Sequence, residues 1–261
     1  MLEKFTIGNL TIDWYWIFVC IATVVSTTYL YCLLQKRKDI SVSLLDFIFI
    51  VSGLFFSGYF GSRLCSVIDY LLGINKDITI PLIVSNFFSI NVFEWYGGLL
   101  FTLFFLFVCK FIYQADFYNF LLLCLTKSIC IVLAIGKFGC FLSGHHGCYG
   151  KETNLPWACS FHYGLNPPAH PVHPIQLYDI VFNTVIFFLI VKFEKMKIGG
   201  IAIFLGYISI FCCYNFFMES QRDVSKTFSI FSLGQICYAI IFVIGSVTWV
   251  MGVYTSRDSR K

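Results

Sequence analysis

Residues 136–179 read GKFGCFLSGHHGCYGKETNLPWACSFHYGLNPPAHPVHPIQLYD, and this stretch decides how the rest of the chain must be arranged. It holds all five histidines and five of the six prolines of a chain of 261 residues. The sequence on either side is built mainly of apolar and aromatic residues. Polar groups between membrane-crossing segments are costly and usually have a use. We therefore expect the functional site in and around this polar stretch.

The composition outside that stretch is that of an integral membrane protein. Hydrophobic residues make up 58% of the chain and charged residues only 12%, whereas soluble domains carry about 25% charged residues. The net charge of +4 does not indicate nucleic-acid binding, because the basic residues form short clusters at the ends of apolar segments. We expect no nucleic-acid partner.

Seven apolar segments are long enough to cross a bilayer, because about 20 helical residues span a hydrocarbon core about 30 Å thick. We expect spans at about residues 14–34, 44–68, 95–110, 117–141, 175–191, 198–218 and 231–253. The predicted fold is an all-α integral membrane protein with one polytopic domain, 1–261. A polar head segment, 142–172, separates the fourth and fifth spans.

The basic residues predict the orientation of these spans. Ten of the 18 Lys and Arg residues fall on one side of the predicted membrane, five fall on the other and three lie within spans. Because basic residues are retained in the cytoplasm, the N-terminus and the head are expected outside and the C-terminus inside.

Several charged residues lie within or at the ends of the predicted spans. Arg63, Lys137 and Arg222 all fall near the predicted outer ends, and Lys127 shares a helix with Lys137. Buried charges usually face a protein interior or a polar cavity. Three converging cations would suit an anionic phosphate, which arginine binds through a two-pronged fork and lysine through a point charge.

The alternative for these cations is a structural one. Each side chain can reach the membrane interface and pair with a nearby acid. The acids available for this on the outer side are Asp69, Glu94 and Asp223.

The histidines and cysteines of the head raise the question of a metal. His145, His146 and Cys148 form a His-His-x-Cys sequence that is not a usual ligand pattern, and neither paired CxxC motifs nor HExxH occur. We therefore expect no metal and no cofactor. A disulfide between two of Cys140, Cys148 and Cys159 is compatible with an oxidising outer side.

Three motifs in the polar stretch resemble the bacterial phosphatidylglycerol:prolipoprotein diacylglyceryl transferase family. They are Gly-Lys-Phe-Gly-Cys-Phe-Leu-Ser-Gly at 136–144, Gly-Cys-Tyr-Gly-Lys-Glu-Thr-Asn-Leu-Pro-Trp at 147–157 and His-Pro-Ile-Gln-Leu-Tyr-Asp at 173–179. Other motifs follow in the family's order along most of the chain. These are the opening at 7–15, Gly61-Ser62-Arg63, Tyr96-Gly97-Gly98-Leu99 and Glu219-Ser220-Gln221-Arg222-Asp223.

The resemblance implies an activity in the bacterial cytoplasmic (inner) membrane. Such enzymes move the diacylglyceryl group of phosphatidylglycerol to the lipobox cysteine in the signal peptide of a prolipoprotein, so membrane lipids and prolipoproteins are the expected partners. The chemistry needs an anion site for the leaving phosphate and a base for the thiol. The resemblance assigns catalysis to Tyr96, Lys137 and Arg222. It assigns substrate binding to Arg63, Gly97, Gly98, Cys140, Ser143, His173, Tyr178 and Glu219.

The chain departs from the family pattern at three of these positions. Tyr96 stands where the family's H-G-G-L motif has histidine, and Lys137 and Cys140 replace the arginine and asparagine of its G-R-x-x-N motif. A tyrosine with a pKa near 10 is a poor base at neutral pH, so either Tyr96 relays a proton or His145 or His146 does so instead. The departures leave two alternatives open: a sister transferase with another donor or acceptor, and a non-catalytic lipid-binding protein.

Overall fold

The computed structural model describes residues 5–7, 10–37, 42–73, 84, 87–88, 94–144, 149–162, 167–222 and 231–258. Within these residues, seven helices are long and apolar enough to cross a membrane. They are α1 (Trp14–Leu34), α2 (Leu44–Gly73), α4 (Trp95–Ile112), α5 (Ala115–Ser143), α6 (Ile175–Lys195), α7 (Gly200–Gln221) and α8 (Leu233–Asp258). The predicted all-α fold with seven spans is therefore confirmed, with several helices a few residues longer than expected.

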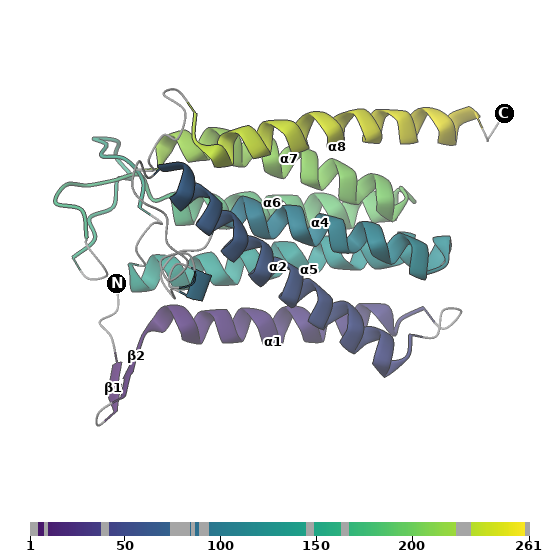
Figure 1. Ribbon diagram of the computed structural model, residues 1–261, viewed down its shortest axis with the longest axis horizontal. Coiled ribbons are helices and arrows are strands. Elements are labelled where there is room, and N and C mark those ends of the chain that lie inside the picture. The colour runs from purple at the N-terminus through teal and green to yellow at the C-terminus, as the bar shows by residue number, and fades with distance from the viewer. Residues whose placement is uncertain are drawn as a thin grey trace.

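The helices run side by side, so that each connection lies at one of two ends of the bundle (Figure 1). The head and an antiparallel hairpin of β1 (Phe5–Ile7) and β2 (Leu10–Ile12) lie at one end, and the C-terminus lies at the other. Helix α5 is the centre of the bundle, because it packs against α1, α6 and α7. Which end faces the cytoplasm remains a prediction from the charge distribution.

Local sequence signals fix the helix ends that border the head. The side chain of Asp13 caps α1 by accepting a hydrogen bond from the Tyr15 amide at 2.9 Å. Helix α5 ends at Gly144, whose φ of 60° lies in the left-handed region that favours glycine. This turn directs the chain out of the bundle and into the head.

Two glycines allow α2 and α4 to touch backbone to backbone. A β-carbon at Gly61 would collide with the carbonyl oxygen of Gly97, and one at Gly97 would collide with the carbonyl oxygen of Gly61. Gly98 of α4 likewise faces the carbonyl of Gly58 of α2. The close approach positions Tyr96, which precedes the glycine pair, against the core of the bundle.

The head is held to the bundle by short stretches of paired backbone. Val172 pairs with both Glu152 and Cys159 within the head, and Gly150 joins the head to the bundle by pairing with Arg222 just beyond α7. The amide of Lys151 also donates to the carbonyl of Gln221 at 2.7 Å. The head therefore lies directly over the ends of α6 and α7.

Candidate active site

Asp179, in the first turns of α6, is the centre of a buried network of charges. Its Oδ2 lies 2.8 Å from the Lys137 ammonium of α5 and 3.5 Å from the Arg222 guanidinium beyond α7. Its Oδ1 accepts a hydrogen bond from the Tyr214 hydroxyl at 2.9 Å. The Asp179 side chain is 5% exposed, so these contacts replace water. Side chains from α5 and α7 thus both contact the Asp179 carboxylate of α6.

Both cations have a second contact at this end of the bundle. The Lys137 ammonium lies 5.5 Å from the centre of the Trp95 ring, within the range of a cation–π interaction. Arg222 donates to Glu219 Oε2 at 3.3 Å. The two cations are therefore balanced by two carboxylates, those of Asp179 and Glu219. An anionic group that entered this site would compete with these carboxylates for both cations.

The structure brings together two of the three predicted outer cations. Lys137 and Arg222 share Asp179, whereas the Arg63 guanidinium lies over the Tyr59 ring on its own helix at 5.4 Å. Arg63 is 2% exposed. Lys137 and Arg222 pair with Asp179 and Glu219, which are not among the three acids considered from the sequence. Asp223 lies outside the described residues.

Lys127 belongs to the opposite end of the bundle. Although it shares α5 with Lys137, its ammonium pairs with Glu194 at the far end of α6. Because α5 and α6 are antiparallel neighbours, the two lysines pair with acids near opposite ends of α6. Lys127 therefore takes no part in the Asp179 network.

Aromatic and imidazole groups of the head border the Asp179 network. The Tyr178 hydroxyl accepts a hydrogen bond from the Trp157 indole at 2.7 Å and lies 3.3 Å from Nδ1 of His173. Tyr178 is adjacent to Asp179 on α6. The predicted residues His173 and Tyr178 thus form a rim between the head and the charged site.

A second group of side chains surrounds Tyr96. A β-carbon at Gly234 of α8 would lie 3.2 Å from both the Tyr96 ring and Glu219 Oε1. The side chains of Tyr96 and Glu219 therefore both lie next to Gly234. Tyr96 is 4% exposed, and its hydroxyl has no hydrogen-bond partner within the described part of the chain. Burial is the main cause that raises the pKa of Glu94 to about 7, and the negative charges of Asp69 and Glu219 add to it. Glu219 thus joins the Tyr96 group to the Arg222 side of the site.

The remaining predicted residues lie at the contact of α4 with α2 and in the last turns of α5. Gly97 and Gly98 face α2, as described above. Ser143 donates to the carbonyl of Cys140 at 3.4 Å within the last turns of α5, and both side chains are buried. No disulfide joins Cys140 to Cys159, and Cys148 lies outside the described residues.

Three residues of the site were not among the predicted site residues, although Glu94 was named as an acid that could pair with the outer cations. Asp179 and Gln176 stand in the His-Pro-Ile-Gln-Leu-Tyr-Asp motif, and their spacing of three places both on one face of α6. Gln176 is fully buried, with neither amide atom bonded to any described residue. Glu94 precedes the Tyr96 motif. A buried amide or acid in an otherwise apolar segment was the signal that could have found them.

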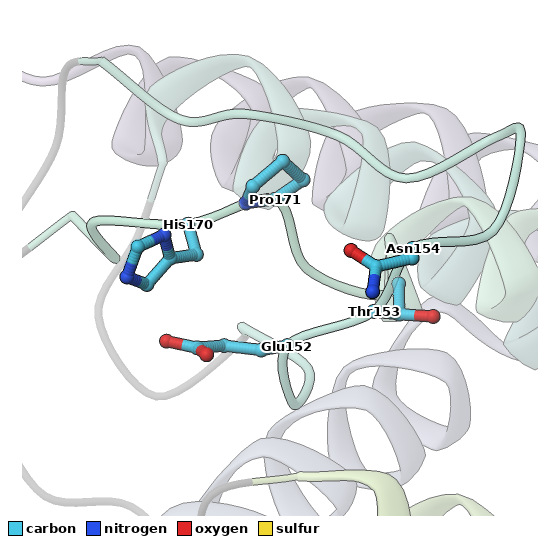
Figure 2. A pocket seen from close by; sticks show the side chains of 5 residues that line it. All are labelled: Glu152, Thr153, Asn154, His170 and Pro171. Atoms are coloured by element: carbon cyan, nitrogen blue, oxygen red, sulfur yellow. The ribbon is translucent and has the colours of Figure 1, made fainter.

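The head contains an open polar cavity of about 260 Å³. Glu152 and His170 extend toward the same opening, with Asn154 and Thr153 farther along the wall (Figure 2). Within the described residues, no three His, Cys, Asp or Glu side chains are grouped so that they could hold a metal ion. His145 and His146 lie outside those residues.

The fold and the site define a multi-pass membrane protein with a buried charged site where its helices meet a polar head. The family model for prolipoprotein diacylglyceryl transferase matches residues 3–251, and the chain belongs to this family. It is a bacterial family of membrane proteins, and the resemblance drawn from the sequence motifs is confirmed.

Individual relatives are similar at modest identity. A phosphatidylglycerol–prolipoprotein diacylglyceryl transferase of Clostridium botulinum is 27% identical over 264 residues, which cover 98% of this chain and 97% of the relative. The protein of the same description from Clostridioides difficile is 30% identical over 127 residues, or 49% of this chain. One from Leptospira interrogans is 32% identical over 124 residues, or 44% of this chain. The matched part of this chain spans 47% of the C. difficile relative and 38% of the Leptospira relative.

Proposed function

We propose that this protein transfers the diacylglyceryl group of phosphatidylglycerol to the lipobox cysteine of prolipoproteins. The observation that carries the proposal is the pairing of Lys137 and Arg222 on Asp179, inside a chain that matches the transferase family over nearly its whole length. The relatives named above are described as enzymes with this donor and this acceptor. The proposed location is the bacterial cytoplasmic (inner) membrane.

In this proposal, the cysteine thiolate attacks the glyceryl carbon that carries the phosphate ester. A sulfur–carbon bond forms, the carbon–oxygen bond to phosphate breaks, and glycerol phosphate leaves with the bonding electrons. Negative charge therefore grows on the phosphate oxygens as the reaction proceeds. Arg222 and Lys137 would stabilise that charge by exchanging Asp179 for the phosphate, at a site that is largely closed to water.

The aromatic rim between the head and Asp179 suggests how the acceptor is positioned. Trp157 is 56% exposed while its indole is hydrogen-bonded to Tyr178. An apolar signal peptide in the membrane and its polar continuation outside would meet at such an amphipathic rim. We propose that His173 and Tyr178 hold the lipobox region there, next to the cations.

A rescue experiment tests the proposed function. Expression of this chain in a bacterial strain depleted of its own transferase should restore growth, and mass spectrometry of a reporter lipoprotein should show the added diacylglyceryl mass. Growth without that mass, or with a different lipid mass, would favour a sister transferase. Binding of phosphatidylglycerol without any modification would favour the non-catalytic alternative.

A further inference from the structure

Gln176, in the first turn of α6, is a buried amide with no hydrogen-bond partner among the described residues. It is 0% exposed, and both Oε1 and Nε2 are unpaired within that part of the chain. Nearly all buried polar groups in proteins are paired, because a buried group without a partner is costly. A primary amide can both donate and accept hydrogen bonds. An amide with both ends open is suited to a ligand that does the same.

Helical geometry places Gln176 beside the cation site. It precedes Asp179 by three residues, so the two side chains lie on one face of α6, about 4.5 Å apart along the helix axis. Both side chains are buried, so this face packs against the rest of the protein. Asp179 in turn contacts the cations of Lys137 and Arg222. The amide therefore lies about one turn closer to the head than the proposed phosphate site.

A single residue of the head contacts both Arg222 and the start of α6. Gly150 pairs with Arg222. A β-carbon at Gly150 would lie 2.5 Å from the carbonyl oxygen of His173 and 3.0 Å from the side chain of Ile175, which directly precedes Gln176. The Arg222 side chain is only 10% exposed. A phospholipid that reaches Arg222 must therefore open the same closed layer in which Gln176 lies.

The chemistry of a free amide favours hydroxyl groups over other polar headgroups. A hydroxyl both donates and accepts, so two neighbouring hydroxyls can occupy the amide oxygen and the amide N–H together. A phosphate oxygen only accepts and an ammonium group only donates, and each would leave one end of the amide unpaired. The acyl chains of a phospholipid held by its phosphate at the cations would extend into the membrane. Its headgroup would then extend toward the head, where Gln176 lies.

We propose that Gln176 selects the lipid donor by binding the hydroxyl groups of its headgroup glycerol. This inference rests on the proposed function. One hydroxyl donates to Oε1 and the other accepts from Nε2, while Lys137 and Arg222 hold the phosphate. Gln176 thus binds the part of the donor that leaves as glycerol phosphate and takes no part in bond making. Its role is to determine specificity.

The test compares two donors, phosphatidylglycerol and phosphatidylpropanol, which differ only in these hydroxyls. Each is supplied in phosphatidylcholine vesicles to the purified full chain with a synthetic lipobox peptide, and mass spectrometry of the peptide gives kcat/KM. The wild-type protein should prefer phosphatidylglycerol by about 10- to 100-fold, because phosphatidylpropanol cannot form either hydrogen bond. Gln176→Met keeps the length of the side chain without the amide. In this variant the preference should nearly disappear, mainly through slower transfer from phosphatidylglycerol.

Asn183 provides the matched control. It is a second buried amide of α6, 3% exposed, but it lies on the other side of Asp179, away from the head. There its Nδ2 donates to the backbone carbonyl of Asp179 at 2.7 Å. Asn183→Leu removes an amide from the same helix and keeps the shape of the side chain. Whatever its overall rate, this variant should retain the wild-type preference between the two donors.

Each failure has a distinct meaning. A wild-type protein that transfers lipid from neither donor would overturn the proposed function together with this inference. Equal use of both donors by the wild-type protein would overturn the inference alone, even if Gln176→Met did not fold. The inference also fails if Gln176→Met keeps the wild-type preference. It fails equally if Asn183→Leu loses that preference as fully, since the preference would then depend on the packing of α6.

Discussion

Asp179 is the residue through which the two cations of the site are linked. A buried carboxylate shared by a lysine and an arginine compensates charges that would otherwise be costly in the membrane. The two cations differ in what they can offer a phosphate. The guanidinium of Arg222 binds two oxygens at once, and the ammonium of Lys137 acts as a point charge.

This difference leads to a prediction at the level of single residues. Arg222→Lys should lower transfer by about 10- to 100-fold, because a charged hydrogen bond is worth about 1.5–3 kcal/mol. Lys137→Arg should keep or raise activity, because it adds a donor and retains the charge. The measurement is kcat/KM with phosphatidylglycerol vesicles and a lipobox peptide. Full activity of Arg222→Ala would remove this residue from the site.

At the scale of the helices, the sequence was sufficient to predict the features that depend on the length of an apolar segment. The seven spans could be predicted because each depends on a local pattern. The partners of the charges could not, since they depend on which helices are neighbours. Lys127 and Lys137 share α5, yet one pairs with Glu194 and the other with Asp179. Their place on a shared helix therefore did not predict their partners, which neighbouring helices supply.

The contact of α2 with α4 yields a prediction at this scale. Gly61→Ala should lower the melting temperature of the protein in detergent, because the added methyl group would collide with the backbone of Gly97, and overpacking of this kind costs about 1–3 kcal/mol. Transfer activity should fall as well, since Tyr96 adjoins that contact. Gly136→Ala is the matched control, with no atom within 4 Å of the added carbon. There, helix propensity favours alanine, so an equal loss at Gly136 would refute the packing argument.

At the scale of the whole molecule, the chemistry gathers at one end of the bundle. The Asp179 network, the Tyr96 group and the head all lie where α5 and α7 end and α6 begins. The opposite end holds the Lys127–Glu194 pair and the connection from α6 to α7. An enzyme that modifies a precursor during secretion would need its site near the outer face of the membrane. The excess of basic residues at the opposite end agrees with that orientation.

Labelling of single cysteines tests the orientation. In a background without the other accessible cysteines, Asn154→Cys in the exposed part of the head should react with an impermeant maleimide in whole cells. Met196→Cys is the matched control, because Met196 is 62% exposed in the turn between α6 and α7 at the other end. It should react only after the membrane is opened. The reverse pattern would place the head, and with it Asp179 and Tyr96, on the cytoplasmic side, where the acceptor cysteine of a translocated precursor would not meet them.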